Sequence, residues 1–342
     1  MTQKKTPVAR PTQADVARLA GVSRTTVSYV LNNSNTISVL PETRKRIWDA
    51  VQQLGYVPNR MARGLRARKT YTIAGIVPDI TNPYHPAFER GIQDVAERYD
   101  YDLVMYNTAN LETKERKFLT FVLEGRADGL IGIFWHMTME DFRPLLERDI
   151  PIVRSSGERQ EAPDLPLDTL YIDNVGAARA AVNYLIEQGH RRIGMLAGEL
   201  LPCKWRVAGY RQALAEHDIA FDESLVLGSP FTAHDGYAQM QILLTRRPRP
   251  TAVFCASDLL AMGALAAIKQ AGLKIPDDVA VVGFDNIFAA ELVSPPLTTI
   301  DQFQESFGRR AAEMLFERLH GQVSTGGRCV EMPYQLVVRE SA

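Results

Sequence analysis

Two short stretches near the N-terminus carry apolar residues at the spacing of amphipathic helices. The positions i, i+3 and i+4 are filled by Val16, Leu19 and Ala20 in the first stretch and by Val27, Val30 and Leu31 in the second. Only a short turn around Gly21 separates them, and glycine readily adopts the left-handed backbone that ends a helix. We therefore expect a helix-turn-helix within residues 12–32.

Residues that suit helix capping stand before both stretches. Thr12 and Asp15 form a variant of the capping box, with Asp in place of the usual Glu or Gln, and Ser23 precedes the second helix. Burial of the second apolar stripe leaves outward four side chains that can contact base edges and phosphates: Arg24, Thr25, Ser28 and Tyr29. The spacing alone is also compatible with an ordinary helical hairpin that binds no DNA.

A third helix and a basic segment follow. Pro41 suits the first turn of this helix and Gly55 its end, and its buried positions are expected to be Ile47, Ala50, Val51 and Leu54. Asn59 can then cap a short helix over residues 60–66, which is too short to be stable alone. The arginines of this segment have two interpretations, a solvated linker or a segment that folds only against DNA, and we favour the second.

From Tyr71 onward the pattern changes to apolar runs that alternate with helical stretches. The runs suit buried parallel strands: TIAGIVPD, DLVMYN, GLIGIF, PIVRSS, RIGMLAG, AVFCAS and VAVVGFD. Such alternation predicts a doubly wound α/β body, and its length suggests two similar subdomains. We expect the chain to cross between them near residues 168–171 and to return near residues 297–302. A last helix (residues 302–320) and a last strand, CVEMPYQLVV, complete the body.

The charge is distributed unevenly along the chain. Residues 1–70 hold 13 Lys+Arg and 3 Asp+Glu, whereas the rest holds 26 and 37. A basic N-terminal part on an acidic body indicates a localised surface for a polyanion. The three scattered cysteines indicate neither a disulfide framework nor a zinc site. Because no segment has the pattern of a membrane span or a signal peptide, we expect a cytoplasmic protein that contacts no membrane.

Candidate ligand-binding side chains follow the predicted strands. Ligands of open α/β sheets bind outside the carboxyl ends of the strands. The sequence places there Asp79, Asn82, Asn107, Trp135, His136, Ser155, Ser156, Glu199, Asp258, Asp285 and Asn286. Carboxylates and amides beside an aromatic ring suit a polyhydroxylated ligand. Alternatives exist for three of these positions. Asp258 can cap the following helix, Asp285 can belong to a simple turn, and Trp135 can lie on a loop or dimer surface.

No motif of catalysis or cofactor binding is present. The sequence lacks GxSxG, HExxH and GxxxxGK[ST], and the connection after the first strand, PDITNPYHP, has no glycine for a dinucleotide phosphate. The six histidines are scattered without metal-binding spacing. We therefore expect no enzyme, no metal and no cofactor.

Taken together, the motifs resemble those of the lactose/galactose repressor (LacI/GalR) family. They are DVARLAGVSRTTVSYVLN, LGYVPN with the following Ala, Arg and Leu, VPDITNPY, RVAGY, GFDN and PPLTTI, in this order from about Thr12 to Arg339. The resemblance implies that Arg24 and Thr25 read the major groove. Tyr29 stands where the family commonly has Arg. Leu65, beside Ala62, matches a leucine that members wedge into the minor groove.

The resemblance also extends both sets of candidate site residues. Arg206 in RVAGY matches an effector-binding arginine, Asp258 and Asp285 match positions that bond effector hydroxyls, and Phe231 matches an aromatic that covers the ligand. The expected DNA-binding set is Thr12, Ser23, Arg24, Thr25, Ser28, Tyr29, Asn32, Asn59, Arg60, Ala62, Arg63 and Leu65. The expected effector-binding set is Asp79, Asn82, Tyr84, Trp135, Ser156, Arg206, Phe231, Asp258 and Asp285.

The implied architecture is a helix-turn-helix headpiece (residues 1–57), a hinge segment (58–70) and a core like periplasmic sugar-binding proteins (71–342). The core is expected to comprise a subdomain of residues 71–170 and 302–329 and another of residues 171–301 and 330–340, joined by three crossovers. The chain ends without the leucine heptads that some members use to tetramerise, so a homodimer on a pseudo-palindromic operator is expected.

The implied function is a transcriptional regulator, and most directly a repressor of carbohydrate-metabolism genes that a small sugar-like effector releases from double-stranded operator DNA. A corepressor-dependent or purine-responsive regulator uses the same parts. A solute-binding receptor shares the α/β body, but the basic headpiece argues against it.

Overall fold

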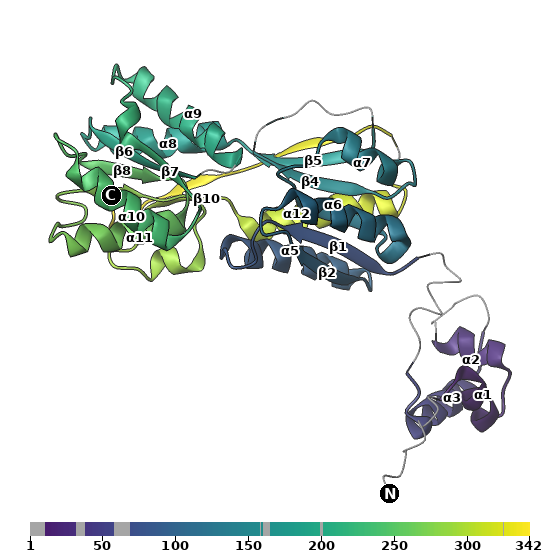
Figure 1. The fold of residues 1–342 in the computed structure, drawn as a ribbon. Coiled ribbons are helices and arrows are strands. Elements are labelled where there is room, and N and C mark those ends of the chain that lie inside the picture. Colours follow the sequence, from purple (N-terminus) through teal and green to yellow (C-terminus); the bar gives the residue numbers. More distant parts are fainter. Residues whose placement is uncertain are drawn as a thin grey trace, which may run out of the picture. The chain divides into compact units, whose positions relative to one another are not determined.

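The computed structural model describes residues 11–31, 38–57, 69–157, 159, 165–198, 201–323 and 325–342. The chain divides into two compact units, Met1–Thr70 and Tyr71–Ala342 (Figure 1). The expected hinge contacts Asn59, Arg60, Ala62, Arg63 and Leu65, and also Asn32, lie outside the described residues.

The first unit contains the three expected helices, α1 (Gln13–Ala20), α2 (Arg24–Leu31) and α3 (Pro41–Leu54). Their shared core contains Val16, Val27, Val30, Ile47 and Ala50, as the helical spacing predicts. Leu19 is an exception, because 45% of it is exposed while its neighbours Ala17 and Ala20 are buried. The stripe of α1 that packs against the other helices is therefore centred on Val16, Ala17 and Ala20.

The local signals at the helix ends act as expected. The Oγ1 atom of Thr12 accepts a hydrogen bond from the Asp15 N–H, and the Asp15 carboxylate accepts one from the Thr12 N–H at 2.9 Å. The Oγ atom of Ser23 accepts from the Thr26 N–H at 3.0 Å, which caps α2. Gly21 and Gly55 end α1 and α3 with φ values of 66° and 61°, which a side chain disfavours.

The second unit contains two parallel sheets, one in each subdomain. The first sheet has the order β11-β5-β4-β3-β1-β2, and its strands are β1 (Thr72–Val77), β2 (Asp102–Asn107), β3 (Gly129–Ile133), β4 (Ile152–Ser156), β5 (Leu167–Ile172) and β11 (Cys329–Met332). The second sheet has the order β7-β6-β8-β9, and its strands are β6 (Ile193–Gly198), β7 (Val226–Ser229), β8 (Ala252–Cys255) and β9 (Ala280–Val282). All seven strands predicted from apolar runs are present, whereas β5 and β7 were not predicted as strands.

Helices cover both faces of each sheet (Figure 1). In the first subdomain α5 (Tyr84–Arg98) packs against α12 (Gln304–Leu319) on one face, and the other face carries α6 (Glu112–Phe121), its π-helical extension Val122–Arg126 and α7 (Met139–Leu146). In the second subdomain α8 (Asn174–Glu187) packs against α9 (Leu201–Glu216), and α10 (Ala233–Thr245) packs against α11 (Asp258–Gln270). The doubly wound arrangement that the alternating pattern predicts is confirmed.

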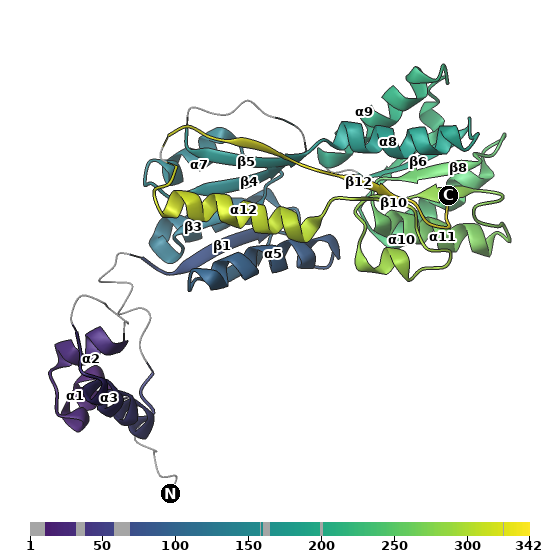
Figure 2. The ribbon, with the colours of Figure 1, turned by 180° about the vertical axis from the view of Figure 1, so that it is seen from behind.

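Three chain segments connect the subdomains, and we call them the first, second and third crossovers. The first follows β5 at Asp173, the second joins β10 (Thr299–Asp301) to α12, and the third joins β11 to β12 (Gln335–Val337). Strands β10 and β12 pair antiparallel, so the last two crossovers run side by side (Figure 2). The expected boundaries at residues 170 and 329 fall within or next to paired strands, since β5 and β11 pair up to Ile172 and Met332. The first subdomain therefore extends to these residues.

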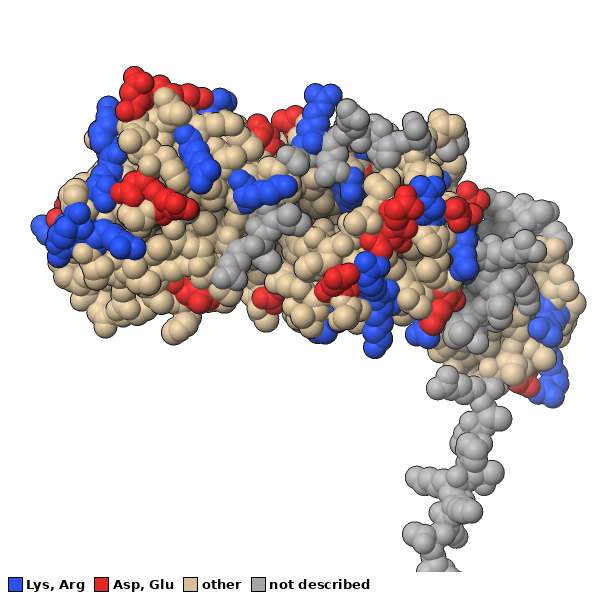
Figure 3. All heavy atoms as spheres, turned by 45° about the horizontal axis from the view of Figure 1, so that its top comes forward, with Lys and Arg blue, Asp and Glu red and all other residues tan. Residues whose placement is uncertain are grey.

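The surface of the second unit shows no dominant charge on the face seen in Figure 3. Basic and acidic side chains are interspersed over this face. Among the described residues, no helix is long and apolar enough to cross a membrane.

Candidate functional site

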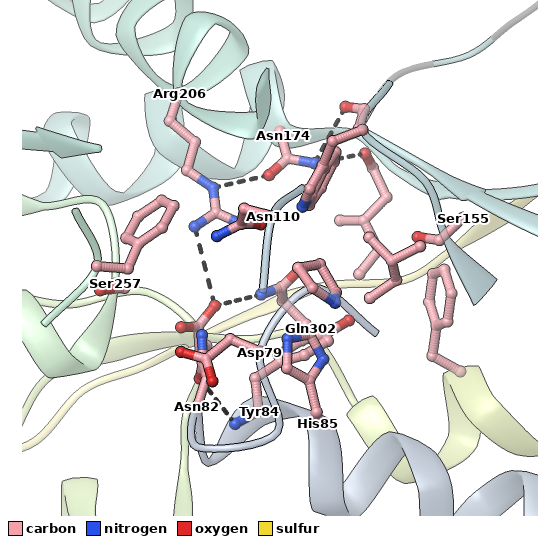
Figure 4. Close-up of a pocket in the computed structure, with 18 of the residues that line it drawn as sticks. Asp79, Asn82, Tyr84, His85, Asn110, Ser155, Asn174, Arg206, Ser257 and Gln302 are labelled. Atoms are coloured by element: carbon pink, nitrogen blue, oxygen red, sulfur yellow. Dashed lines mark hydrogen bonds and ion pairs between the residues drawn. The ribbon is translucent and has the colours of Figure 1, made fainter. Parts of the chain in front are cut away.

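A cavity of about 350 Å³ lies between the two subdomains, at the carboxyl ends of strands from both sheets. Eight of the nine expected effector-binding residues line it: Asp79, Asn82, Tyr84, Trp135, Ser156, Arg206, Phe231 and Asp285. The ninth, Asp258, does not. Figure 4 shows Arg206 entering from the second subdomain and Asp79, Asn82, Tyr84 and His85 entering from the first.

Arg206 is the central cation of the cavity and is only 6% exposed. It lies on α9, and its Nε donates to Asn174 Oδ1 at 2.8 Å, while Nη1 donates to the carbonyl of Ala256. The guanidinium carbon lies 3.7 Å from the centre of the Phe284 ring. A planar guanidinium suits this combination of stacking and several fixed acceptors.

Asp285 faces Arg206, with Oδ1 3.8 Å from Nη1. Burial raises the pKa of Asp285 to about 8, the Arg206 charge opposes this shift, and the nearby Asp258 charge adds to it. Gln302 donates from Nε2 to the same Oδ1 atom at 2.6 Å. The carboxyl group thus presents an oxygen to the cavity that protein groups already hold in place.

Asp258 does not line the cavity and is buried behind the residues that do. Its Oδ1 accepts from the Thr299 hydroxyl at 2.6 Å, and its Oδ2 accepts from the Ile287 N–H at 2.8 Å. It is fully buried, and burial raises its pKa to about 6. The cap of α11 is Ser257, which accepts from the Leu260 N–H at 3.2 Å, so Asp258 is the first residue of the helix instead. The structure therefore places Asp258 where it supports the loop that carries Asp285.

The first subdomain contributes the loop after β1 and the start of α5. Asp79 accepts from the Thr81 N–H at 2.9 Å, and Asn82 Oδ1 accepts from the Tyr84 N–H at 3.0 Å, so both side chains shape the turn that they line. His85 is 5% exposed, and burial lowers its pKa to about 4 despite the Asp79 charge. Its imidazole is consequently neutral at pH 7.

A buried carboxylate positions Trp135 after β3. Both oxygens of Glu115 accept backbone N–H groups, from Trp135 at 3.0 Å and from His136 at 3.1 Å. Glu115 is fully buried on α6, so it holds the loop after β3 in place from the interior of the first subdomain. Trp135 therefore lines the cavity from the loop after β3.

Sequence reasoning missed several cavity residues: His85, Asn110, Asn174, Gln302 and Phe307. Three buried polar atoms of the cavity lining accept or donate no hydrogen bond within the described part of the chain, namely His85 Nδ1, Asn110 Oδ1 and Trp135 Nε1. Such atoms are costly unless a ligand or water satisfies them. The strand-end rule gives Ser155, which lines the cavity, and could have found Asn110 as well. Gln302 and Phe307 come from the second crossover and the helix after it, whose place beside the cavity the spacing does not reveal.

In the first unit, α2 presents the expected DNA-binding residues. Ser23, Arg24 and Thr25 are exposed at its start, and Ser28 and Tyr29 are half-buried one turn later. Thr12 is exposed at the start of α1. Ser23, Arg24 and Thr25 thus stand at the N-terminal end of α2, the part of a recognition helix that contacts base edges.

Metal binding finds no support in the geometry of the described residues. No group of three or more His, Cys, Asp or Glu side chains among them is placed to hold a metal ion. The cavity can instead supply hydrogen-bond donors, acceptors and aromatic faces to an organic ligand.

Two family models match the chain. Residues 12–59 match the family described as "Bacterial regulatory proteins, lacI family", and residues 182–342 match the "Periplasmic binding protein-like domain". A curated relative, the HTH-type transcriptional repressor CytR of Escherichia coli (strain K12), is 38% identical over all of this chain and 98% of its own length. The HTH-type transcriptional repressor PurR of Vibrio campbellii is 36% identical over 96% of this chain and 97% of its own length.

Solved structures show the same architecture. The Lac repressor dimer bound to operator and the anti-inducer ONPF superposes with a TM-score of 0.85 at 25% identity, over 97% of this chain and 99% of that chain. A complex of the transcriptional regulator CelR with cellobiose gives a TM-score of 0.72 at 34% identity, over 97% of this chain and all of that chain.

Proposed function

The chain belongs to the LacI family of bacterial transcriptional repressors, and on this premise we propose that it represses its target genes until a small neutral effector occupies the cavity between its subdomains. The observation that carries the proposal is the convergence of Arg206, Asp285 and Trp135 from both subdomains on one cavity of about 350 Å³. A ligand that contacts both sides stabilises one relative angle of the subdomains.

The chemistry of the lining favours a polyhydroxylated effector. Asp285 and Arg206 offer an acceptor and donors for hydroxyl groups, and Trp135 and Phe231 offer ring faces for the apolar side of a sugar. Among the lining residues that the structure describes, Arg206 is the only Lys or Arg, Asp285 faces it, and His85 is neutral at pH 7. The unsatisfied indole N–H of Trp135 and the unsatisfied side-chain carbonyl of Asn110 would each form a hydrogen bond with one further polar group of the effector.

DNA binding is assigned to α2 and to the segment that follows α3. Arg24 and Thr25 would contact base edges in the major groove, while Ser23, Ser28, Tyr29 and Thr12 contact the backbone. Residues 59–65 would insert Leu65 into the minor groove of a pseudo-palindromic operator bound by a homodimer. The relative angle of the subdomains would set the distance between the two copies of this segment, and so determine whether the segment folds on the DNA.

Fluorescence anisotropy with a labelled duplex from the region upstream of the gene tests the DNA-binding part. We expect specific binding whose affinity falls steeply between about 50 and 200 mM salt, as phosphate contacts require. The variant Arg24→Gln should lose most of its preference over a scrambled duplex, whereas Arg191→Gln, far along the chain in the second subdomain, should not. Equal binding of both duplexes by the wild-type protein would contradict the proposal.

A thermal-shift screen of sugars, sugar acids, phosphosugars and purines tests the effector part. A ligand that binds only the folded protein at about 100 times its Kd stabilises it by about 2.7 kcal/mol. We expect a neutral polyhydroxylated compound to raise the melting temperature of the second unit. A rise only with charged phosphosugars or sugar acids would contradict the effector class proposed.

A further inference from the structure

Arg206 and Asp285, which face each other in the cavity, are hydrogen-bonded to two of the three crossovers. Asn174, directly after the first crossover, accepts from Arg206 and donates to the carbonyls of Gly157 at 3.0 Å and Ile172 at 3.1 Å. Gln302, in the second crossover, donates to Asp285 at 2.6 Å. Arg206 and Asp285 are therefore linked by hydrogen bonds to two of the segments that connect the subdomains.

Behind Asp285, three residues that do not line the cavity form a connected group. Asn286 Nδ2 donates to Asp301 Oδ2 at 3.0 Å, and Arg339 Nη2 donates to Asn286 Oδ1 at 2.9 Å. Asp301 ends β10 at the second crossover, and Arg339 follows β12 after the third. We call Asn286, Asp301 and Arg339 the crossover bracket, since they join the ends of two crossovers to the loop that carries Asp285.

The backbone at the bracket adopts conformations that side chains disfavour. The φ angles of Asp285, Asn286 and Phe303 are 125°, 57° and 50°. Conformations of this kind are unfavourable for residues other than glycine and persist where the surroundings hold them. Asp301 Oδ1 accepts from the Phe303 N–H at 2.7 Å, and Gln304 donates to the carbonyl of Asp285. The hydrogen bonds of the crossover bracket thus hold the second crossover in a backbone conformation that it would not keep without them.

Arg339 also anchors the bracket to the second subdomain. Its Nη1 donates to the carbonyl of Leu297 at 2.7 Å, and its backbone N–H donates to Thr298 Oγ1 at 2.9 Å. The Asp285 N–H in turn donates to the carbonyl of Ile300 at 2.9 Å. The bracket, β10 and the Asp285 loop therefore form one hydrogen-bonded body on the second-subdomain side of the crossovers.

From these contacts we propose that Asn286, Asp301 and Arg339 are positioning residues that set the equilibrium between subdomain arrangements without touching the effector. The inference rests on the proposed function of the cavity. An effector hydroxyl that donates to Asp285 Oδ1 competes with the hydrogen bond from Gln302. Loss of that hydrogen bond weakens the attachment of the second crossover to the Asp285 loop, at the place where the crossover bracket holds it. The crossover bracket thereby sets the free-energy difference between the two subdomain arrangements. The effector must overcome this difference when it shifts the protein from one arrangement to the other.

The distance between the subdomains provides the test, and it needs neither DNA nor effector. Spin labels are attached to cysteines introduced as Lys117→Cys on α6 and Lys269→Cys on α11, both exposed, in a Cys329→Ser background of the full chain. Electron double resonance then compares Arg339→Met and Asn286→Ala with the unchanged bracket. Arg191→Met is the matched control, because Arg191 likewise donates to a backbone carbonyl of the second subdomain, that of Ile186 at 2.8 Å.

We expect both bracket variants to change the ratio of distance populations about fivefold or more, the lower end of typical couplings, while the Arg191→Met distribution stays unchanged. The double variant Asn286→Ala with Arg339→Met should change the ratio of distance populations by less than the product of the two single-variant factors. Both substitutions break the same hydrogen bond between Arg339 and Asn286, so their effects are not independent. If a bracket variant does not fold, Arg339→Lys replaces it and should give an intermediate distribution. Distributions of Arg339→Met and Asn286→Ala that coincide with the control would overturn the inference. Since no DNA or effector is present, that result is independent of a failure of the proposed function.

Discussion

At the scale of single residues, Arg206 is defined by partners that come from far apart in the sequence. Asn174, Ala256, Phe284 and Asp285 surround one guanidinium; Asn174 begins α8, Ala256 follows β8, and Phe284 and Asp285 follow β9. Only a planar group with several donors can bond to Asn174 and Ala256 while it stacks on Phe284. The role of Arg206 therefore depends on its shape as well as its charge.

The variant Arg206→Lys tests this dependence. Lysine keeps the charge but cannot reproduce the planar set of contacts, and a hydrogen bond to a charged group contributes about 1.5–3 kcal/mol. We expect effector affinity, measured by calorimetric titration with the compound found in the thermal-shift screen, to fall about tenfold or more. DNA affinity without effector should stay close to that of the wild-type protein. Equal effector affinity would show that the cation is not used in the way proposed.

His85 gives the protein a pH dependence whose sign follows from its burial. Its pKa falls from 6.5 in the unfolded chain to about 4 in the folded protein, so between these values the unfolded chain binds more protons. The stability contribution is therefore present above about pH 6.5 and is lost as the pH falls through this window toward 4. The variant His85→Phe removes the titration and should show a smaller fall in melting temperature between pH 7 and pH 5. Parallel pH profiles for the two proteins would contradict this assignment.

At the scale of elements, helices α5 and α12 approach each other through glycine. A Cβ atom on Gly91 would lie 2.0 Å from the carbonyl oxygen of Glu305, and one on Gly308 would lie 2.0 Å from that of Phe88. Neither backbone can give way without separating the helices. This contact also positions Phe307, which lines the cavity from the start of α12.

The variant Gly91→Ala should therefore destabilise the second unit, although alanine is the better helix former by about 1 kcal/mol. Overpacking of this kind costs about 1–3 kcal/mol or more, and we expect a loss of unfolding free energy in this range in urea titrations. Gly228→Ala in β7 is the control, because a Cβ there meets nothing within 4 Å. An unchanged or raised stability of Gly91→Ala would mean that the helices can separate at little cost.

The elements that the sequence predicts are those with a local signal. The three headpiece helices have capping residues and apolar stripes, and seven strands are apolar runs, most of them buried, with the edge strand β2 as the exception. Strand β5 (LDTLYI) lies where the sequence led us to expect a crossover, and Asp168 interrupts its apolar run. The structure shows Asp168 paired with Arg318 and Arg328, 150 and 160 residues away, and spacing cannot predict such partners. The same limit explains why Asp258 was expected in the cavity: its partner Thr299 is 41 residues away.

At the scale of the whole molecule, the fold joins a DNA-binding unit to a two-subdomain body that holds a ligand cavity. The effector can change DNA affinity only by the difference between its affinities for the two subdomain arrangements. Couplings of this kind typically amount to about 1–3 kcal/mol, or about 5- to 150-fold in affinity. Occupancy of the cavity must therefore change the affinity for the operator by a measurable factor.

The most direct test is the anisotropy of a labelled operator duplex titrated with the wild-type protein at fixed salt, with and without a saturating amount of the compound found by thermal shift. Our account predicts that the compound weakens operator binding about fivefold or more, and that Arg206→Lys needs a higher concentration of the compound for the same effect. A compound that tightens binding would keep the coupling but reverse its sign, making it a corepressor. An operator affinity that does not change while the cavity is saturated would contradict the account.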